Sequence, residues 1–261
     1  MMNKNTDILG VKVSQLNYPL ALNIIFDWVK NRRKNYVCVA AVHSIMECQK
    51  DPRLLAGLNR AGLVTPDGMP LVWLLKADGQ KHVERVYGPD LMLKICARAS
   101  QIGATIFLLG GIRGQSKKLK NVLQKKFPGI RVVGHVDTPV RPLPKQKNQQ
   151  IIKQINIAKP QLIFIGLGCP QQELWMIDNL PNLKTGIAIG VGAAFNFLTG
   201  RVKQAPHWMR SAGLEWFFRL LQEPRRLGRR YLVFNFLFIF LISKQFSVNL
   251  FKKIKKTFNA N

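Results

Sequence analysis

Residues 104–111 read ATIFLLGG, a continuous apolar run that ends in two glycines. The segment that follows, residues 115–127 (QSKKLKNVLQKKF), is basic and predicts a helix. An apolar run without alternating polar positions is typical of a strand that is buried on both faces. The two segments together predict an α/β fold, with a parallel sheet that helices cover on both faces.

The same succession of strand and helix recurs on both sides of residues 104–111. Short apolar or β-rich runs predict further strands at residues 36–42, 63–68, 129–136, 161–170 and 185–195. Helices are predicted over residues 44–61, 88–103 and 151–160. Within the second of these, Pro89 opens the helix and Gly103 closes it. The Pro-rich residues 137–150 predict a surface loop.

Composition limits the class of protein. Of 261 residues, 47% are hydrophobic, which is enough for one large domain, alone or with an appendage, and argues against global disorder. The four cysteines lie far apart without a CxxC pair, which favours buried thiols in a reduced compartment. The first 16 residues lack a long apolar run, so we expect no secretory signal and a cytosolic start.

The net charge of +27 indicates a polyanionic partner: nucleic acid, anionic lipid or a phosphorylated substrate. Residues 201–261 carry 13 Lys and Arg against 2 Asp and Glu, whereas residues 1–200 carry 27 against 11. The C-terminal segment is therefore the more basic per residue, and it is also the most apolar. We expect a main domain at residues 1–200 and an appendage at residues 201–261.

A single carboxylate, Asp67, lies at a turn in the apolar segment LVTPDGMPLVWLL (residues 63–75). In parallel sheets ligands bind beyond the carboxyl ends of the strands. Four predicted turns fall at this edge: Asp67, Gly110–Gly111, residues 166–173 (GLGCPQQE) and residues 190–197 (GVGAAFNF). Asp67 is therefore placed where an α/β fold carries its chemistry.

Gly110 and Gly111 follow an apolar strand and precede a helix, an arrangement in which backbone N–H groups can approach a phosphate. The segment has neither a complete GxGxxG nor a Walker lysine, and glycine turns also serve as plain chain reversals. Both interpretations stay open. The missing dinucleotide fingerprint argues against a nicotinamide dehydrogenase on the same fold.

At residues 171–173 two glutamines and a glutamate stand at a predicted helix start. Amides donate and accept hydrogen bonds, so they suit a uracil edge, a sugar hydroxyl or an acetamido group. The alternative is a helix N-terminus with a favourably placed glutamate.

Arg219, Arg226 and Arg229 have helical spacing, although Pro224 interrupts any continuous helix. Guanidinium groups bind diphosphates through bidentate contacts, and no DxD pair is present to hold a divalent ion. We therefore expect arginine rather than a metal at the departing nucleotide. A solvated basic face is the competing interpretation, strongest for residues 252–256.

Residues 231–242 (YLVFNFLFIFLI) are nearly all apolar. As a helix they are about 18 Å long, shorter than the ~30 Å hydrocarbon core of a bilayer. Their basic flanks favour a segment that lies in the interface of an anionic leaflet. A buried core helix is the alternative.

The four histidines do not cluster with acids or serines at the spacing of a catalytic triad. Each is expected to be structural or exposed to solvent. His43 is the one candidate for a site, because it follows a predicted strand in AAVHS.

Six segments in this order resemble the WecG/TagA/CpsF family of bacterial glycosyltransferases, over about residues 10–232. They are TPDGMPLVW, ERVYGPDLM, FLLGG, GLGCPQQELW, GVGAAFNFLTGRVKQAP and GLEWFFRLLQEPRRLGRRY. The resemblance implies a Rossmann-like domain with an appendage that meets the membrane and completes the active site. It implies transfer of N-acetylmannosamine or its uronic acid from UDP to undecaprenyl-diphosphate-linked N-acetylglucosamine. The reaction is expected to invert the anomeric centre without a metal.

Carried over from the family, Asp67 is the expected general base, which removes the proton of the acceptor hydroxyl. The resemblance places Gln172 near the donor, and Arg219, Arg226 and Arg229 on the diphosphate. Gly110 and Gly111 are further candidates for the diphosphate. His43, Arg85 and Asn196 are candidates for contact with the acceptor or the sugar.

Three positions depart from the family pattern. Val39 and Ala41 stand where many relatives have Thr and Asn, and those polar side chains are expected to face the sugar. Asn196 stands where Asp is common, which replaces a charge with an amide. The identity of the donor sugar is therefore open.

We expect a glycosyltransferase that works on the cytoplasmic membrane face with a UDP-sugar, a polyprenyl-diphosphate acceptor and an anionic surface, without cofactor or nucleic acid. Self-association is left open. The alternative is a non-catalytic protein that binds nucleic acid or an anionic surface. That alternative predicts aromatic residues interleaved with Lys and Arg on an open face. The aromatics instead cluster in apolar runs such as FNFLFIF, which suits lipid better.

Overall fold

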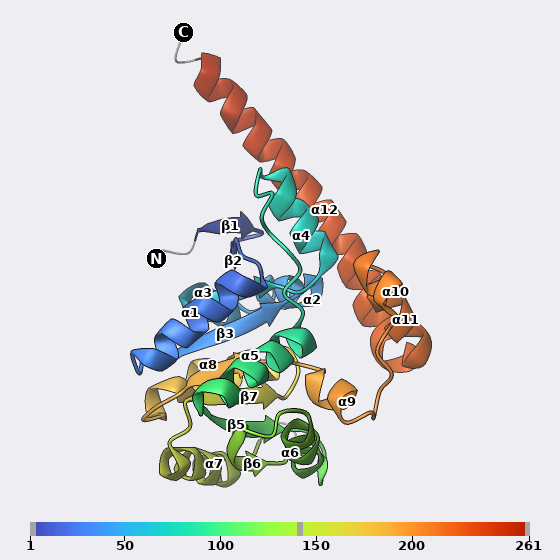
Figure 1. Ribbon diagram of the computed structural model, residues 1–261. Coiled ribbons are helices and arrows are strands. Elements are labelled where there is room, and N and C mark those ends of the chain that lie inside the picture. The colour runs from blue at the N-terminus through green and yellow to red at the C-terminus, as the bar shows by residue number, and fades with distance from the viewer. Residues whose placement is uncertain (1–3, 140–142, 259–261) are drawn as a thin grey trace.

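The computed structural model describes residues 4–139 and 143–258, without the side chains of residues 226, 229, 230 and 249–258. Within these residues six parallel strands form one sheet, in the order β4-β3-β8-β7-β5-β6 (Figure 1). The strands are β3 (Asn35–Ala40), β4 (Leu63–Pro66), β5 (Thr105–Gly110), β6 (Arg131–Val136), β7 (Leu162–Gly166) and β8 (Ile187–Gly190). The predicted α/β fold with a parallel sheet is confirmed.

Helices cover both faces of the sheet, and a hydrophobic core lies under each group. In β5, Ile106 and Leu108 face one core while Phe107 and Leu109 face the other, as the period of two in a strand requires. The first core is covered by α1 (Tyr18–Lys30), α5 (Gly88–Ile102), α6 (Gln115–Lys126) and α9 (Ala194–Leu198). The second is covered by α2 (Val42–Cys48), α3 (Pro52–Arg60), α4 (Met69–Ala77), α7 (Lys145–Ala158) and α8 (Gln171–Asn179), which the short η1 (Leu180–Asn182) follows.

An antiparallel hairpin of β1 (Asn5–Ile8) and β2 (Val11–Ser14) packs on the second core. The hairpin was not among the predicted elements. Its strands have four residues each, so the apolar pattern in the sequence is short.

Two helix boundaries differ from the prediction. The helix expected over residues 44–61 is two helices, because Asp51 accepts hydrogen bonds from the backbone N–H groups of Arg53 and Leu54 and Pro52 opens a new helix. Helix α7 begins at Lys145, inside the segment predicted as a loop. Gly103 closes α5 in the left-handed conformation (φ 68°), as predicted.

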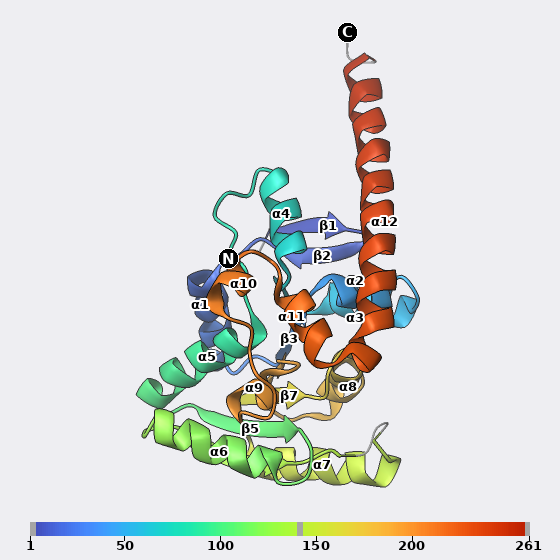
Figure 2. The same ribbon diagram turned by 90° about the vertical axis from the view of Figure 1, so that its right-hand side faces the viewer.

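The C-terminal segment consists of α10 (His207–Ser211), α11 (Glu215–Gln222) and the long α12 (Pro224–Phe258). Pro224 occupies the first position of α12, so the expected interruption lies between α11 and α12. Figures 1 and 2 show α12 running past the body of the molecule, with its far end well beyond the other elements.

One face of α12 packs on the domain. Phe234 and Phe238 are buried in the second core. Further along the helix, the Gln245 side chain accepts a hydrogen bond from the backbone N–H of Leu9 (3.0 Å) and donates to the Asp7 carbonyl (3.1 Å). The helix is therefore fastened to the β1–β2 hairpin.

The rest of the apolar part of α12 is exposed. An 18-residue window, Tyr231–Val248, has a mean hydropathy of 1.6 and is only 11% buried. The alternative of a buried core helix is therefore wrong. The window is longer than residues 231–242, so length no longer excludes a membrane span, although the packed face holds this segment against the domain.

Candidate active site

A cavity of about 1320 Å³ lies at the carboxyl ends of β3, β4, β5, β7 and β8, and residues of α11 and α12 complete its wall. Every strand of this group is followed by residues that line the cavity: Ala41, Asp67, Gly111, Gly168 and Gly192. The predicted edge of the sheet thus carries the cavity, and the C-terminal segment contributes to it.

Asp67 leaves β4 with its backbone N–H bonded to the Ala40 carbonyl of β3 (2.8 Å), so the neighbouring strand fixes its position. Gly68 then caps α4, and the Asp67 side chain stays on the cavity wall with 19% of its surface exposed. The Arg85 guanidinium is its partner: Nη2 lies 3.0 Å and Nε 3.2 Å from Asp67 Oδ1. Arg85 Nε also donates to the Asp67 carbonyl.

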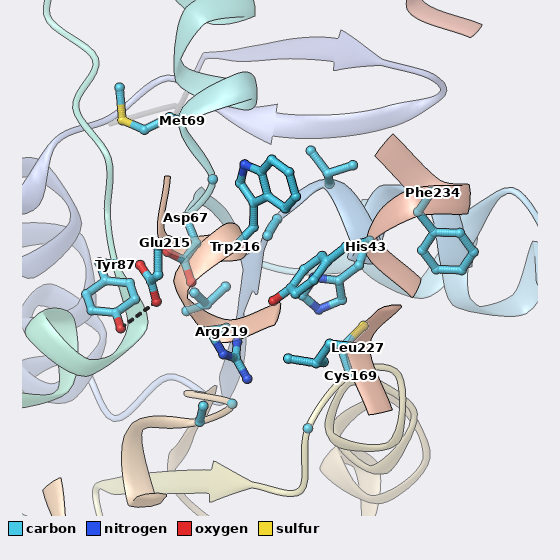
Figure 3. A pocket seen from close by; sticks show the side chains of 18 of the residues that line it. His43, Asp67, Met69, Tyr87, Cys169, Glu215, Trp216, Arg219, Leu227 and Phe234 are labelled. Carbon is cyan, nitrogen blue, oxygen red and sulfur yellow. Dashed lines mark hydrogen bonds between the residues drawn. The ribbon is translucent and has the colours of Figure 1, made fainter. Parts of the chain in front are cut away.

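Arg85 pairs with a second carboxylate, which comes from the C-terminal segment. Its Nη2 lies 2.7 Å from Glu215 Oε2, at the start of α11. The other oxygen of Glu215 accepts a hydrogen bond from the Tyr87 hydroxyl (2.9 Å), which Figure 3 shows as a dashed line. One guanidinium therefore joins the carboxylate of the domain to that of α11.

Burial raises the pKa of Asp67 to about 6, and the negative charge of Glu215 adds to the rise. The Arg85 charge and hydrogen bonds from Arg85 and the Gly88 backbone act in the opposite direction. Arg85 stays charged throughout, because the carboxylates of Asp67 and Glu215 raise its pKa although burial alone would lower it. Asp67 is thus mainly ionised at neutral pH and close enough to its pKa to accept a proton.

Arg219, one turn along α11 from Glu215, lines the same cavity as Asp67 (Figure 3). Its guanidinium carbon lies 5.8 Å from the centre of the Phe197 ring. Its Nε is buried and has no hydrogen-bond acceptor among the residues that the structure describes. A buried donor of this kind is suited to an oxygen-rich ligand in the cavity.

The family model for the glycosyl transferase WecG/TagA/CpsF family matches residues 6–251 of the chain, which includes the whole cavity. The chain belongs to the WecG/TagA/CpsF family. The curated relatives include an N-acetylglucosaminyldiphosphoundecaprenol N-acetyl-beta-D-mannosaminyltransferase of Bacillus subtilis, 29% identical over 180 residues (69% of this chain and 68% of the relative). A transferase of the same name from Bacillus spizizenii is 29% identical over 183 residues, or 70% and 69% of the two chains.

Gln172 lines the cavity, yet its amide is bound inside the protein. Nε2 donates to Glu173 Oε1 (2.8 Å), and Oε1 accepts from the Gly192 backbone N–H (2.9 Å). The amide therefore joins the start of α8 to the turn after β8. Its contact with a donor remains a prediction.

The two glycines after β5 differ in their surroundings. Gly111 lines the cavity, with φ at 86°. Gly110 is not among the lining residues; a Cβ there would lie 2.7 Å from the Gly166 carbonyl oxygen, and its φ is 134°. Gly110 allows β5 and β7 to approach each other, and this packing role explains the glycine without a bound phosphate. For Gly111 the phosphate contact stays a prediction.

The remaining candidates of the domain also lie on the cavity wall. His43 stands at the start of α2, and Asn196 in α9 accepts a hydrogen bond from Gln115 Nε2 (2.8 Å). Val39 and Ala41, where the family pattern is polar, line the cavity too. Arg226 and Arg229 fall on α12, but their side chains lie outside the described residues. No group of three or more His, Cys, Asp or Glu side chains that could hold a metal occurs in the part of the chain that the structure describes.

Two residues of the site were missed by sequence reasoning: Glu215 and Tyr87. Glu215 is one of two acids in residues 201–261, so its rarity was a usable signal. Its partner Arg85 is 130 positions away, however, and nothing in either segment indicates the pairing.

Proposed function

We propose that the chain transfers an N-acetylmannosamine-like sugar from a UDP-sugar to a polyprenyl-diphosphate-linked N-acetylglucosamine, with inversion. The observation that carries the proposal is a carboxylate with a raised pKa, Asp67, in one cavity with an arginine of the C-terminal segment, Arg219. The names of the relatives supply the sugar and the lipid-linked acceptor. The family supports a role in the synthesis of cell-envelope polysaccharide.

A single displacement needs one base. The acceptor hydroxyl oxygen forms a bond to the anomeric carbon, and the bond from that carbon to the diphosphate oxygen breaks. The hydroxyl proton passes to Asp67, and UDP leaves with the electron pair. Arg85 holds the Asp67 carboxylate in place through Oδ1, and Glu215 and Tyr87 in turn fix Arg85.

The negative charge on the departing diphosphate needs a positive partner. Arg219 offers a guanidinium with an unsatisfied Nε at the cavity, and we extend this role to Arg226 and Arg229 from the family pattern. We propose that these arginines stand in place of a divalent ion. The donor set of the cavity supports this proposal, because guanidiniums bind diphosphates directly.

We place the enzyme on the inner face of the plasma membrane as a peripheral protein. The exposed side of α12 carries large apolar residues, while Phe234 and Phe238 on the other side pack into the domain. A helix that packs on a protein with one face and exposes apolar side chains on the other is suited to lie at the interface of a bilayer. The net charge of +27 favours an anionic leaflet.

The test is to incubate the purified full-length protein with a panel of UDP-sugars and a lipid-diphosphate N-acetylglucosamine acceptor, and to read products by mass spectrometry. We expect one added N-acetylhexosamine, a β linkage from an α donor, and an unchanged rate in EDTA. Absence of transfer from every UDP-sugar would refute the donor class. A rate that EDTA abolishes and Mg²⁺ or Mn²⁺ restores would refute the metal-independent mechanism.

A further inference from the structure

The cavity is larger than the polar site around Asp67, because it continues as an apolar groove between α4 and α12. Both walls are made almost entirely of apolar side chains. The α4 wall consists of Met69, Pro70, Trp73, Leu74 and Ala77. The α12 wall runs from Asn235 to Phe246 and includes Phe236, Ile239 and Ile242.

The spacing of these residues shows that the groove follows both helices. On α4, Pro70, Trp73 and Ala77 are three and four positions apart, and on α12 Ile239, Ile242 and Phe246 repeat that spacing. Such positions lie on one face of a helix. From Asn235 to Phe246 the wall is about 16 Å long at the rise of an α-helix, which is room for several isoprene units.

The groove begins at the reaction centre. Helix α4 starts two residues after Asp67, so its wall leads away from the carboxylate that we assign as the base. The acceptor must place a sugar hydroxyl at Asp67, and in the relatives' names that sugar is joined through a diphosphate to undecaprenol. The lipid part of such an acceptor must leave the site along some path, and the apolar branch of the same cavity is chemically matched to it.

We propose that the α4–α12 groove binds the polyprenyl chain of the acceptor next to its diphosphate, so that the enzyme selects the lipid as well as the sugar. This inference rests on the proposed function. It assigns two tasks to different faces of α12: the groove face holds one substrate chain, and the outer face contacts the bilayer.

Substitutions at two adjacent residues of α12 can distinguish binding of the polyprenyl chain from contact with the bilayer. Ile239 lines the groove, whereas Phe240 does not, although the two side chains are similarly exposed at 62% and 66%. Ile239→Ser and Phe240→Ser therefore both remove an exposed apolar side chain, the first from the groove and the second from outside it. On the other wall, Trp73→Ala removes a side chain that is 53% exposed and lines the same cavity.

The experiment compares two acceptors with the same N-acetylglucosaminyl diphosphate, one with a long polyprenyl chain and one with two isoprene units, in detergent micelles. We expect Ile239→Ser and Trp73→Ala to raise KM for the long acceptor about ten-fold at unchanged kcat, since each removes an apolar contact with the chain. The effect on the short acceptor should be much smaller. Phe240→Ser should leave KM for both acceptors unchanged.

Equal KM changes in Ile239→Ser and Phe240→Ser, or equal changes for both acceptors, would overturn the groove assignment while leaving the transferase intact. Binding is also read without turnover, by cross-linking a diazirine-bearing polyprenyl diphosphate and mapping the labelled peptides. Labels on α4 and the groove face of α12 support the proposal even if no sugar is transferred. Labels elsewhere, or equal labelling by a diazirine-bearing phospholipid, would contradict it.

Discussion

The sheet domain and the C-terminal segment use the same kinds of residue for different purposes. In the domain, apolar side chains such as Leu108 and Phe164 are fully buried between the sheet and its helices. In α12, Phe236 and Phe240 are largely exposed. The domain also supplies the carboxylate of Asp67, and the C-terminal segment supplies Glu215 and Arg219. The comparison shows that the sheet and its helices form the framework and one carboxylate of the cavity, while the C-terminal segment completes the cavity wall and keeps large apolar side chains exposed.

The largest effect is expected on the domain side. Asp67→Asn keeps the shape but cannot accept a proton, so kcat should fall about 10³-fold, within the range for loss of a general base. UDP binding and the thermal unfolding midpoint should change little. Steady-state kinetics and calorimetry check both. Asp27→Asn, an exposed acid on α1, is the matched control and should keep the full rate.

The next effect tests the contribution of α11. Arg219→Ala should lower kcat about 10²-fold, because one charged donor to the departing diphosphate is lost. Arg219→Lys should recover only part of the rate, since a lysine cannot form the bidentate contact. Arg225→Ala removes an exposed arginine that does not line the cavity, and it serves as the control. Equal rates in Arg219→Ala and Arg225→Ala would show that Arg219 does not assist the reaction.

A smaller effect concerns the exposed face of α12. Val233→Ser and Phe240→Ser remove apolar side chains that do not line the cavity, and together they should weaken binding to anionic vesicles about ten-fold. Co-sedimentation with vesicles of known composition measures this. The wild-type protein should also release with rising salt, because surface charges are screened. Unchanged binding of the double variant would place the membrane contact elsewhere.

The smallest expected effect is a shift in the pH dependence, and it depends on the contact between the domain and the C-terminal segment. With the pKa of Asp67 at about 6, kcat/KM should fall as the pH drops through 6, because the base takes up a proton. Glu215→Gln removes a negative charge that raises the pKa of Asp67, and it leaves Asp67 as the only carboxylate of this pair that binds Arg85. The midpoint of the pH–rate profile should therefore move to lower pH. The groups that face Asp67 are Arg85, Tyr87 and Tyr18 of the domain and Glu215 of α11.

A pH–rate profile of both proteins checks the shift. Tyr87→Phe removes the hydroxyl that binds Glu215 but keeps every charge at neutral pH, so it controls for a loosened α11. The coupling between regions would be disproved by a profile in Glu215→Gln that keeps its midpoint or moves to higher pH.

The sequence predicted the features that depend on neighbouring residues. Unbroken apolar runs such as residues 104–111 identified the strands of a two-sided sheet, and their turns identified the edge where Asp67, Gly111 and Gln172 now line one cavity. The split at Pro52 was predictable in principle from the Asp-Pro pair, which both caps and opens a helix.

The features that could not be predicted depend on contacts between distant segments. The pairing of Arg85 with Glu215 joins positions 130 apart, and local pattern carries no information about it. The groove requires α4 and α12 to lie on either side of one space, and an apolar stripe looks the same whether it meets a core, a bilayer or a substrate. The pKa of Asp67 likewise follows from burial that only the folded chain creates.

The hydrogen bonds between Gln245 and the β1–β2 hairpin have a geometric consequence. They hold α12 at a point near its middle, so residues 5–14 help to set the angle at which the helix leaves the sheet domain. A chimera that received only the C-terminal helix of a relative would gain the apolar surface of that helix. It would not gain the contacts that set the angle between the helix and the domain. The orientation that we propose for the protein on a bilayer therefore depends on the β1–β2 hairpin as well as on α12.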